Sequence, residues 1–206
     1  MVKCGECSVF ACYTGELEKA PKFCPMKNMA DVISRAMEKY EDPLIKAIAS
    51  NSAAVEADGY LKLCRVEETI EFAKRCGLKK IGVAFCIGLR KEARVLVNIL
   101  KKHGFEVYSV VCKAGSIPKE KMNLKKIKID RYEAMCNPIA QAMLLNEMKT
   151  DLNIIFGLCV GHDSLFAMHS KAPVTCLVVK DRVLAHNPIG AVYCSHQYYK
   201  KIFGME

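Results

Sequence analysis

The chain has 206 residues, of which 51% are hydrophobic and 26% are charged, as in an ordinary globular protein. A chain of this length buries enough surface to fold without disulfides. No segment reaches the roughly 18 to 20 uninterrupted apolar residues that span a bilayer, and the first residues lack the apolar run of a signal peptide, so we expect a cytoplasmic protein. Because the cytoplasm keeps thiols reduced, we expect the twelve cysteines to bind metal rather than form disulfides.

The net charge of +9 raises the question of nucleic acid binding. Lysine and arginine are spread along the chain and gather only over 119–128, a pattern more typical of a solvated loop or helix face. No aromatic residues interleave with that run to form a stacking platform. We therefore expect a small molecule or a redox partner rather than nucleic acid or a membrane, and the sequence leaves the oligomeric state open.

Residues 1–27 are rich in Cys, Gly, Lys and Pro without a sustained hydrophobic period, which is typical of a segment shaped by a bound ion. We predict that this segment is a metal knuckle, a short loop folded around a metal ion that its cysteines bind. Helical spacing of apolar residues predicts helices over 28–40, 42–55 and 65–76. These helices are expected to open an α/β domain that covers 28–206.

Short apolar runs then alternate with helical patterns, which indicates a parallel sheet covered by helices. The predicted strands are 80–85, 105–111, 153–156 and 174–179. The first helix between them is closed by His103 and Gly104, and a later one starts at Asn137 as N-cap with Pro138 as its first residue and runs to about Met148. The predicted fold class is therefore α/β, a Rossmann-like parallel sheet with a Cys-rich N-terminal metal-binding segment.

Four cysteines near the N-terminus have the spacing C-x2-C-x4-C-x11-C, and they are Cys4, Cys7, Cys12 and Cys24. Two thiolates separated by two residues can bind one ion through a tight turn, and two more complete four-fold coordination. Zinc and an iron–sulfur cluster both accept four thiolates, so this spacing leaves the metal open. Four free thiols without metal are the alternative.

A second group of cysteines follows the predicted strands. The carboxyl ends of parallel strands meet at one edge of a sheet, where ligands bind. We expect four cysteines near these ends to share one crevice and to hold a 4Fe-4S cluster. These cysteines are Cys86, Cys112, Cys136 and Cys159. The alternative is that they are buried structural cysteines, since free Cys is often buried. The remaining cysteines, for which we expect core or surface roles, are Cys64, Cys76, Cys176 and Cys194.

Cys159 also has a competing interpretation. Residues 157–161 read G-x-C-x-G, the strand-turn-helix pattern that exposes a nucleophile in hydrolases and glutamine amidotransferases. His162, Asp163 or His186 would then act as base and orienting group. Beside a cluster, His162 and Asp163 become candidate catalytic residues that donate protons to a substrate, and helix capping by Asp163 is the alternative without function.

Several segments resemble the family known as domain of unknown function 1847 (DUF1847), described as predicted metal-binding proteins of anaerobic bacteria and archaea. The resemblance rests on Cys4-Gly5-Glu6-Cys7, Cys24-Pro25, Phe85-Cys86-Ile87-Gly88-Leu89, Cys136-Asn137-Pro138, Gly157-Leu158-Cys159-Val160-Gly161-His162-Asp163 and His186-Asn187-Pro188. It implies metal binding by cysteines, and an anaerobic setting would favour iron–sulfur over zinc. It implies no reaction.

The function we expect is therefore that of a metal-binding protein, with an iron–sulfur cluster in the crevice and a role in redox or sulfur chemistry. A zinc-stabilised binding module without catalysis is one alternative, and a hydrolase or amidotransferase with Cys159 as nucleophile is another. The sequence does not decide whether the protein is an enzyme.

Overall fold

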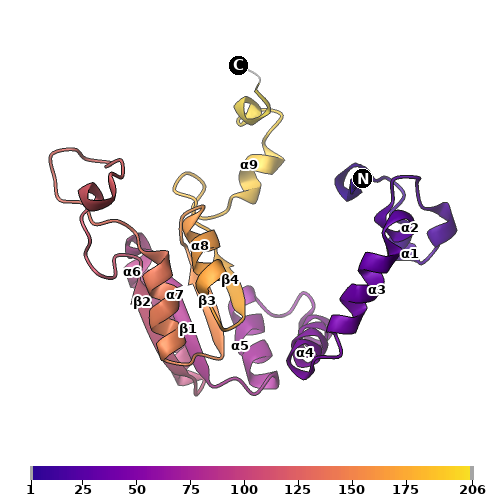
Figure 1. Cartoon of the computed structure of the whole chain (residues 1–206), viewed down its shortest axis with the longest axis horizontal. Coiled ribbons are helices and arrows are strands. Elements are labelled where there is room, and N and C mark those ends of the chain that lie inside the picture. Colours follow the sequence, from indigo (N-terminus) through magenta and orange to yellow (C-terminus); the bar gives the residue numbers. More distant parts are fainter. Residues whose placement is uncertain (1, 205–206) are drawn as a thin grey trace. The chain divides into compact units, whose positions relative to one another are not determined.

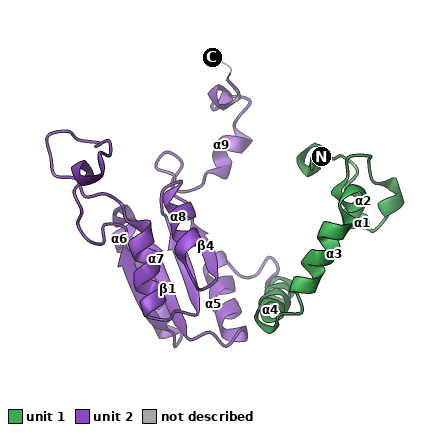
Figure 2. Ribbon diagram, in the orientation of Figure 1, with its two compact units in different colours: residues 1–58 green, residues 59–206 purple. Residues whose placement is uncertain are grey.

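The computed structural model describes residues 2–204, and the chain folds as two compact units, 1–58 and 59–206 (Figure 2). The sequence predicts a boundary after residue 27, and the two compact units divide after residue 58. The reason lies in the helices that follow the Cys-rich segment: α2 (Pro25–Asn28) contacts α3 (Ala30–Lys39), which precedes α4 (Pro43–Gly59).

The N-terminal part of the first unit consists of short helical pieces. They are η1 (Cys4–Glu6), α1 (Ala11–Thr14), η2 (Leu17–Lys19) and α2. Among the described residues, their buried core consists of Ala11, Ala20 and Cys24, with Met26 packed against it. So small an apolar core offers little hydrophobic stabilisation, which agrees with the absence of a hydrophobic period in the sequence.

The second unit is built on a four-stranded parallel sheet in the order β2-β1-β3-β4 (Figure 1). The strands are β1 (Lys80–Phe85), β2 (Glu106–Val111), β3 (Leu152–Phe156) and β4 (Val174–Val178). The predicted α/β fold with a parallel sheet is confirmed. The helical elements of this unit are α5 (Arg65–Arg75), η3 (Ile87–Leu89), α6 (Arg90–Lys102), η4 (Lys119–Met122), α7 (Pro138–Glu147), α8 (His162–His169), α9 (Ile189–Tyr193) and η5 (Lys200–Phe203).

Helices cover both faces of the sheet. On one face, residues of α5 and α6 pack against Ile81, Val83 and Ile154. On the other, residues of α7 and α8 pack against Ala84 and Ile155. Neighbouring strand residues point to opposite faces, so a strand covered on both sides is apolar throughout, as β3 is.

The predicted helix boundaries follow from identifiable caps. The Asn137 side chain accepts a hydrogen bond from Ala140 N at 3.0 Å and Pro138 is the first helical residue of α7. Gly77 and Gly104 have φ of +68° and +90°, and each follows the end of a helix; Gly104 does so as predicted.

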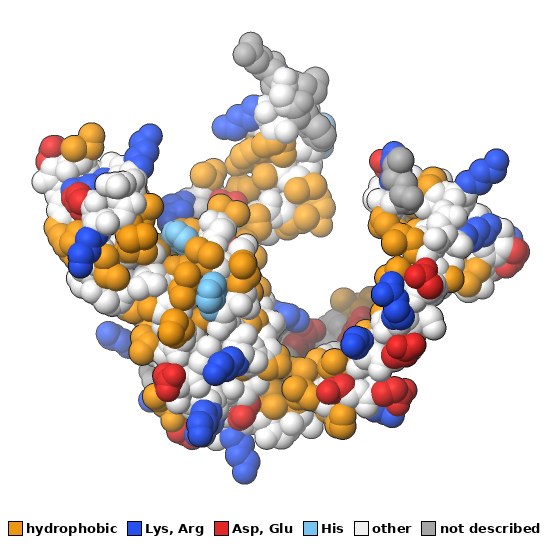
Figure 3. All heavy atoms as spheres, in the orientation of Figure 1, with side chains coloured by type: hydrophobic (Ala, Val, Ile, Leu, Met, Phe, Trp, Pro, Cys, Tyr) orange, Lys and Arg blue, Asp and Glu red, His pale blue; other side chains and the backbone are white. Residues whose placement is uncertain are grey.

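The lysine-rich run over 119–128 lies in the connection between β2 and α7. Lys119 pairs with Glu133 at 2.6 Å, and Lys126 pairs with Glu120 at 2.6 Å. On the face drawn in Figure 3, lysine and arginine side chains are scattered among acidic and apolar ones. These two lysines of the run therefore have acidic partners within their own loop.

Within residues 2–204, no helix combines the length and the hydropathy that crossing a membrane requires.

Candidate thiolate centre

The register of the sheet brings the carboxyl ends of three strands together. Phe85 pairs with both Val111 and Phe156, the last residues of β2 and β3. The chain therefore leaves all three strands at the same edge. This edge includes the point between β1 and β3 where the strand order reverses, the usual location of a ligand crevice in such folds.

Two cysteines interact with Cys112 at this edge, namely Cys136 and Cys86. Cys112, the first residue after β2, has its sulfur 3.8 Å from that of Cys136, which directly precedes the N-cap of α7. Cys112 is also hydrogen-bonded to Cys86, the first residue after β1. Cys86 and Cys112 are buried, with 6% and 2% of their surface exposed. We refer to Cys86, Cys112 and Cys136 as the cysteine triad.

Backbone hydrogen bonds hold the triad in place. Cys86 N donates to Phe156 O at 3.2 Å, and Cys112 N donates to Phe85 O at 2.8 Å. Asn137 N donates to Cys112 O at 2.7 Å, which ties the residue after Cys136 to the end of β2. The three thiols are therefore brought together by the sheet and by the start of α7, and not by a local turn.

The triad has the electrostatics of a site that stabilises thiolates. The hydrogen bond with Cys112 lowers the pKa of Cys86 to about 5, with further contributions from the Gly88 N–H and Lys180. The same partner, together with the charges of Lys113 and His162, lowers the pKa of Cys136 to about 5. The hydrogen bonds with Cys136 and Cys86 raise the pKa of Cys112, and its burial raises it further.

Three cationic side chains approach the sulfurs. Lys113 Nζ lies 3.4 Å from Cys136 Sγ, and it also donates to Ala134 O at 2.6 Å. Lys180 interacts with Cys86, and the position of Gly88 makes this possible: a Cβ there would lie 3.3 Å from Lys180 Nζ and 3.8 Å from Cys86 Sγ. The third cation, Arg182, approaches Cys159.

Cys159 lies in the turn between β3 and α8. Its sulfur accepts a hydrogen bond from Arg182 Nη2 at 3.1 Å. Cys159, Cys86 and Cys136 all raise the pKa of the Arg182 guanidinium, with Cys159 contributing most. The charge of Arg182 therefore interacts with all three thiolates. Cys159 is half-buried and the following Val160 is 92% exposed, so Cys159 stands at the solvent side of the site.

The residues that sequence reasoning missed are the three cations and Gln141. Gln141 is completely buried, and its Nε2 donates to Phe85 O at 3.2 Å and to Val110 O at 2.7 Å, the strand ends that precede Cys86 and Cys112. Its Oε1 has no hydrogen-bond partner among the described residues. Lys113 adjoins Cys112 in the chain, which was an available signal. Lys180 and Arg182 lie beyond β4, and no sequence pattern linked them to the cysteines.

The predicted histidine and aspartate candidates lie at different places. His162 begins α8 and is close enough to Cys136 to lower its pKa. Asp163 Oδ1 accepts a hydrogen bond from Ser164 N at 2.8 Å. His186 Nδ1 accepts one from Asp181 N at 3.1 Å, which holds it in its own turn. Cys159 thus has an arginine as its hydrogen-bond partner, where the nucleophile interpretation expects a histidine.

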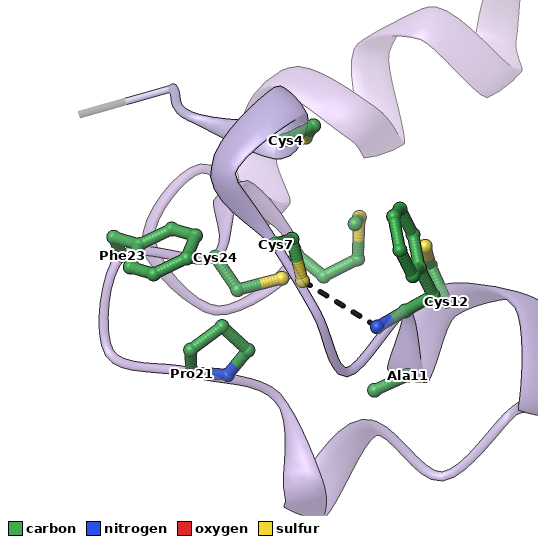
Figure 4. A pocket seen from close by; sticks show the side chains of 9 residues that line it. Cys4, Cys7, Ala11, Cys12, Pro21, Phe23 and Cys24 are labelled. Atoms are coloured by element: carbon green, nitrogen blue, oxygen red, sulfur yellow. Dashed lines mark hydrogen bonds between the residues drawn. The ribbon is translucent and has the colours of Figure 1, made fainter.

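The four N-terminal cysteines line one small cavity of about 30 Å³ (Figure 4). Cys24 is buried, Cys7 is half-buried, and Cys4 and Cys12 are exposed. Phe10 N donates to Cys7 Sγ at 3.4 Å, and Phe10 adopts a φ of +48°, a strained conformation for a non-glycine residue. The cavity is completed by Phe10, Ala11, Pro21, Phe23 and Met26.

Neither the strand-end cysteines nor the N-terminal cysteines form a complete coordination sphere for a single ion. In the part of the chain that the structure describes, no three or more cysteine, histidine or acidic side chains are gathered closely enough around one point to hold a metal ion.

Comparison with known proteins shows which family the chain belongs to. The sequence profile described as "Protein of unknown function (DUF1847)" matches residues 24–177. The chain belongs to this family. The matched segment includes the triad and Cys159, whereas Cys4, Cys7 and Cys12 lie before it. The chain is also similar to an uncharacterized protein of Methanocaldococcus jannaschii, with 51% identity over 201 residues that cover 98% of each chain. No solved structure matches it.

Proposed function

We propose that this DUF1847 protein is a metalloprotein of the reducing cytoplasm whose crevice holds an iron–sulfur cluster on cysteine thiolates. The observation that carries the proposal is the contact of Cys112 with both Cys86 and Cys136 at the strand ends. Buried structural cysteines need no such grouping, and they need no cations around them. Sulfur-only ligands select zinc or iron–sulfur clusters over magnesium, calcium or manganese.

The surroundings of the triad fit an anionic sulfur centre. Ile87 N donates to Cys112 Sγ at 3.4 Å, and the Gly88 N–H is hydrogen-bonded to Cys86. Such N–H to sulfur bonds and nearby charges set the reduction potential of a cluster. Lys113, Lys180 and Arg182 offset the negative charge of the thiolates. When bound, the cluster would supply one-electron transfer or a Lewis-acidic metal for sulfur chemistry.

Zinc is the second candidate, and one distance favours it. In a tetrahedral zinc site with Zn–S bonds of about 2.3 Å, neighbouring sulfurs lie about 3.8 Å apart, whereas the thiolates around a four-iron cluster are spread to about 6 Å. The 3.8 Å between Cys112 and Cys136 equals the zinc spacing, and it is also an ordinary contact between two thiols. A zinc-stabilised binding module would contain no acid-labile sulfide and would be colourless.

The N-terminal cysteines are proposed as a second, independent metal site. Their support is the shared cavity, the C-x2-C spacing and the Phe10 N–H bond to Cys7. A bound ion would also account for a segment that folds on a core of three small residues.

Anaerobic purification followed by iron, zinc and acid-labile sulfide analysis tests both sites. We expect about four iron and four sulfide per cluster, and loss of one complement in Cys112→Ser but not in the control Cys64→Ser. Cys64 is an exposed N-cap residue, where serine is an equally good cap. Cys24→Ser tests the N-terminal site in the same way. Retention of the full metal complement in both Cys86→Ser and Cys112→Ser, with circular dichroism unchanged, would refute the crevice site.

A further inference from the structure

Cys112 and Cys136 are placed as a pair of thiols that can be joined. Their sulfurs lie 3.8 Å apart, and Asn137 N donates to Cys112 O at 2.7 Å, which holds the backbone at Cys136 beside that at Cys112. A disulfide requires two neighbouring backbone positions and a sulfur–sulfur distance of about 2.05 Å. Rotation of the two side chains that brings the sulfurs about 2 Å closer would therefore form the bond.

The two thiols differ in their access to solvent. Cys112 is buried, whereas Cys136 is half-buried. The ammonium group of Lys113 lies 3.4 Å from Cys136 Sγ, and a neighbouring cation favours the thiolate, which is the nucleophilic form of cysteine. A reagent in solution would thus meet Cys136 first, with Cys112 directly behind it.

From this arrangement we infer a further activity, in which Cys136 and Cys112 act as a dithiol that reduces low-molecular-weight disulfides. The Cys136 thiolate attacks one sulfur of the substrate, and the other substrate sulfur leaves as a thiolate that takes up a proton. The Cys112 thiol then gives up its proton and attacks the Cys136 sulfur, which releases the second substrate thiol. Two protein thiols and one substrate disulfide thereby become one protein disulfide and two substrate thiols.

This activity goes beyond the proposed metal site and needs no metal. The same sulfurs cannot do both at once, because a metal binds the thiolate and a disulfide has none. The exchange therefore belongs to the metal-free protein, and the metal content of untreated protein is measured separately.

The charges around the sulfurs indicate which disulfides would be preferred. Besides Lys113, Lys180 interacts with Cys86, and the charge of the exposed Arg182 interacts with the thiolates of Cys86 and Cys136. Cations gathered at a site attract anions and raise their local concentration. The substrate class is therefore a small disulfide that carries carboxylates.

The first test uses the full chain, freed of metal with a chelator, reduced, and then treated with glutathione disulfide. After the remaining thiols are blocked, peptide mapping by mass spectrometry should find a disulfide between Cys112 and Cys136. The controls Cys64→Ser and Cys86→Ser should form the same bond. Cys112→Ser should instead retain glutathione on Cys136, because the thiol that releases it is gone.

The wild-type map alone can refute the inference, whether or not a variant folds. Free thiols at both positions, a disulfide between Cys86 and Cys112, or glutathione that stays on Cys136 would each overturn it. The iron, zinc and sulfide contents of untreated protein do not depend on any of these results, so the proposed function stands or falls on its own measurement.

The second test concerns the charge of the substrate. At low ionic strength, Arg182→Gln should slow disulfide formation by glutathione disulfide about threefold to tenfold, and should not slow it with the cationic disulfide cystamine. Lys171→Gln, which changes an exposed lysine of the α8–β4 connection, is the charge-matched control and should leave both rates unchanged. Equal effects of the two variants, or equal slowing with both disulfides, would overturn the preference for carboxylates.

Discussion

Gln141 offers a sharp test of how the strand ends are held beneath the cysteine triad. Its amide nitrogen donates to Phe85 O and Val110 O, and its side chain is completely buried. Gln141→Glu replaces this donor by a carboxylate that faces two carbonyl oxygens at about the same positions. Gln141→Leu has a similar volume but neither donates nor carries charge.

The two variants should differ strongly at pH 7. Gln141→Leu loses two hydrogen bonds of about 0.5–1.5 kcal/mol each, and it also removes the unpartnered Oε1, which offsets part of that loss. We expect a net destabilisation of about 0–2 kcal/mol. Gln141→Glu must bury an unpaired charge or bind a proton, and should cost more than about 3 kcal/mol. For a chain of this length that corresponds to a fall in Tm of at least about 6–12 °C.

The sign of the pH dependence follows from the same geometry. Burial against carbonyl oxygens raises the pKa of the introduced carboxyl above that of the unfolded chain, about 4.3. A protonated carboxyl can donate one of the two lost bonds, so the destabilisation is smallest below that unfolded value. It grows as the pH rises through the unfolded and then the folded pKa.

Thermal unfolding by circular dichroism at pH 4 and pH 7 measures these differences. Gln197→Glu, at an exposed position, is the matched control and should leave Tm unchanged. Equal Tm values for Gln141→Leu and Gln141→Glu at pH 7 would refute the reasoning.

Three further predictions concern other parts of the second unit. Gly82→Ala places a Cβ against Asn153 Oδ1 and 2.8 Å from Leu145 Cδ1, so the free energy of unfolding measured in urea should fall by about 3 kcal/mol. In the control Gly190→Ala the atom nearest to the new Cβ would be at 3.6 Å, and the protein should not be destabilised. Asn137→Ala removes the N-cap bond to Ala140 N and should cost about 1 kcal/mol in the same assay, with Asn137→Asp recovering most of the loss; no loss in the alanine variant would contradict the cap. Lys119 holds the pKa of Glu133 below its usual value, so the ionised Glu133 stabilises the 119–134 loop at pH values above its pKa in the unfolded chain. This stabilisation is lost as the pH falls through the pKa of Glu133 in the folded protein. Hydrogen exchange of that loop should therefore increase in Glu133→Gln at pH 7, while at low pH the variant and the wild type should converge.

The sheet was predictable because its signals are local. Each strand is a short apolar run between turn residues, and caps such as Asn137-Pro138 act on neighbouring backbone groups. The strand ends could be predicted to within one or two residues for the same reason. The boundary after residue 58 had no comparable signal, since it depends on which helices pack together.

The candidate site was predictable in part. Cys86, Cys112 and Cys136 were identified from their places relative to predicted strands, because parallel strands share a carboxyl edge whatever their order. Their partners were not, since Arg182 and Lys180 reach the sulfurs from beyond β4, and Gln141 reaches the strand ends from α7.

The sequence alone determined the parallel α/β architecture and the edge of the sheet at which cysteines accumulate, because both follow from hydrophobic period and capping along the chain. Only the tertiary structure decided that Cys112 interacts with Cys86 and Cys136 while Cys159 pairs with an arginine, and that cations and a buried amide lie near these cysteines. Those facts depend on strand order, on register and on contacts between residues far apart in the sequence, such as Cys112 with Cys136 and Cys159 with Arg182, and no local pattern encodes them.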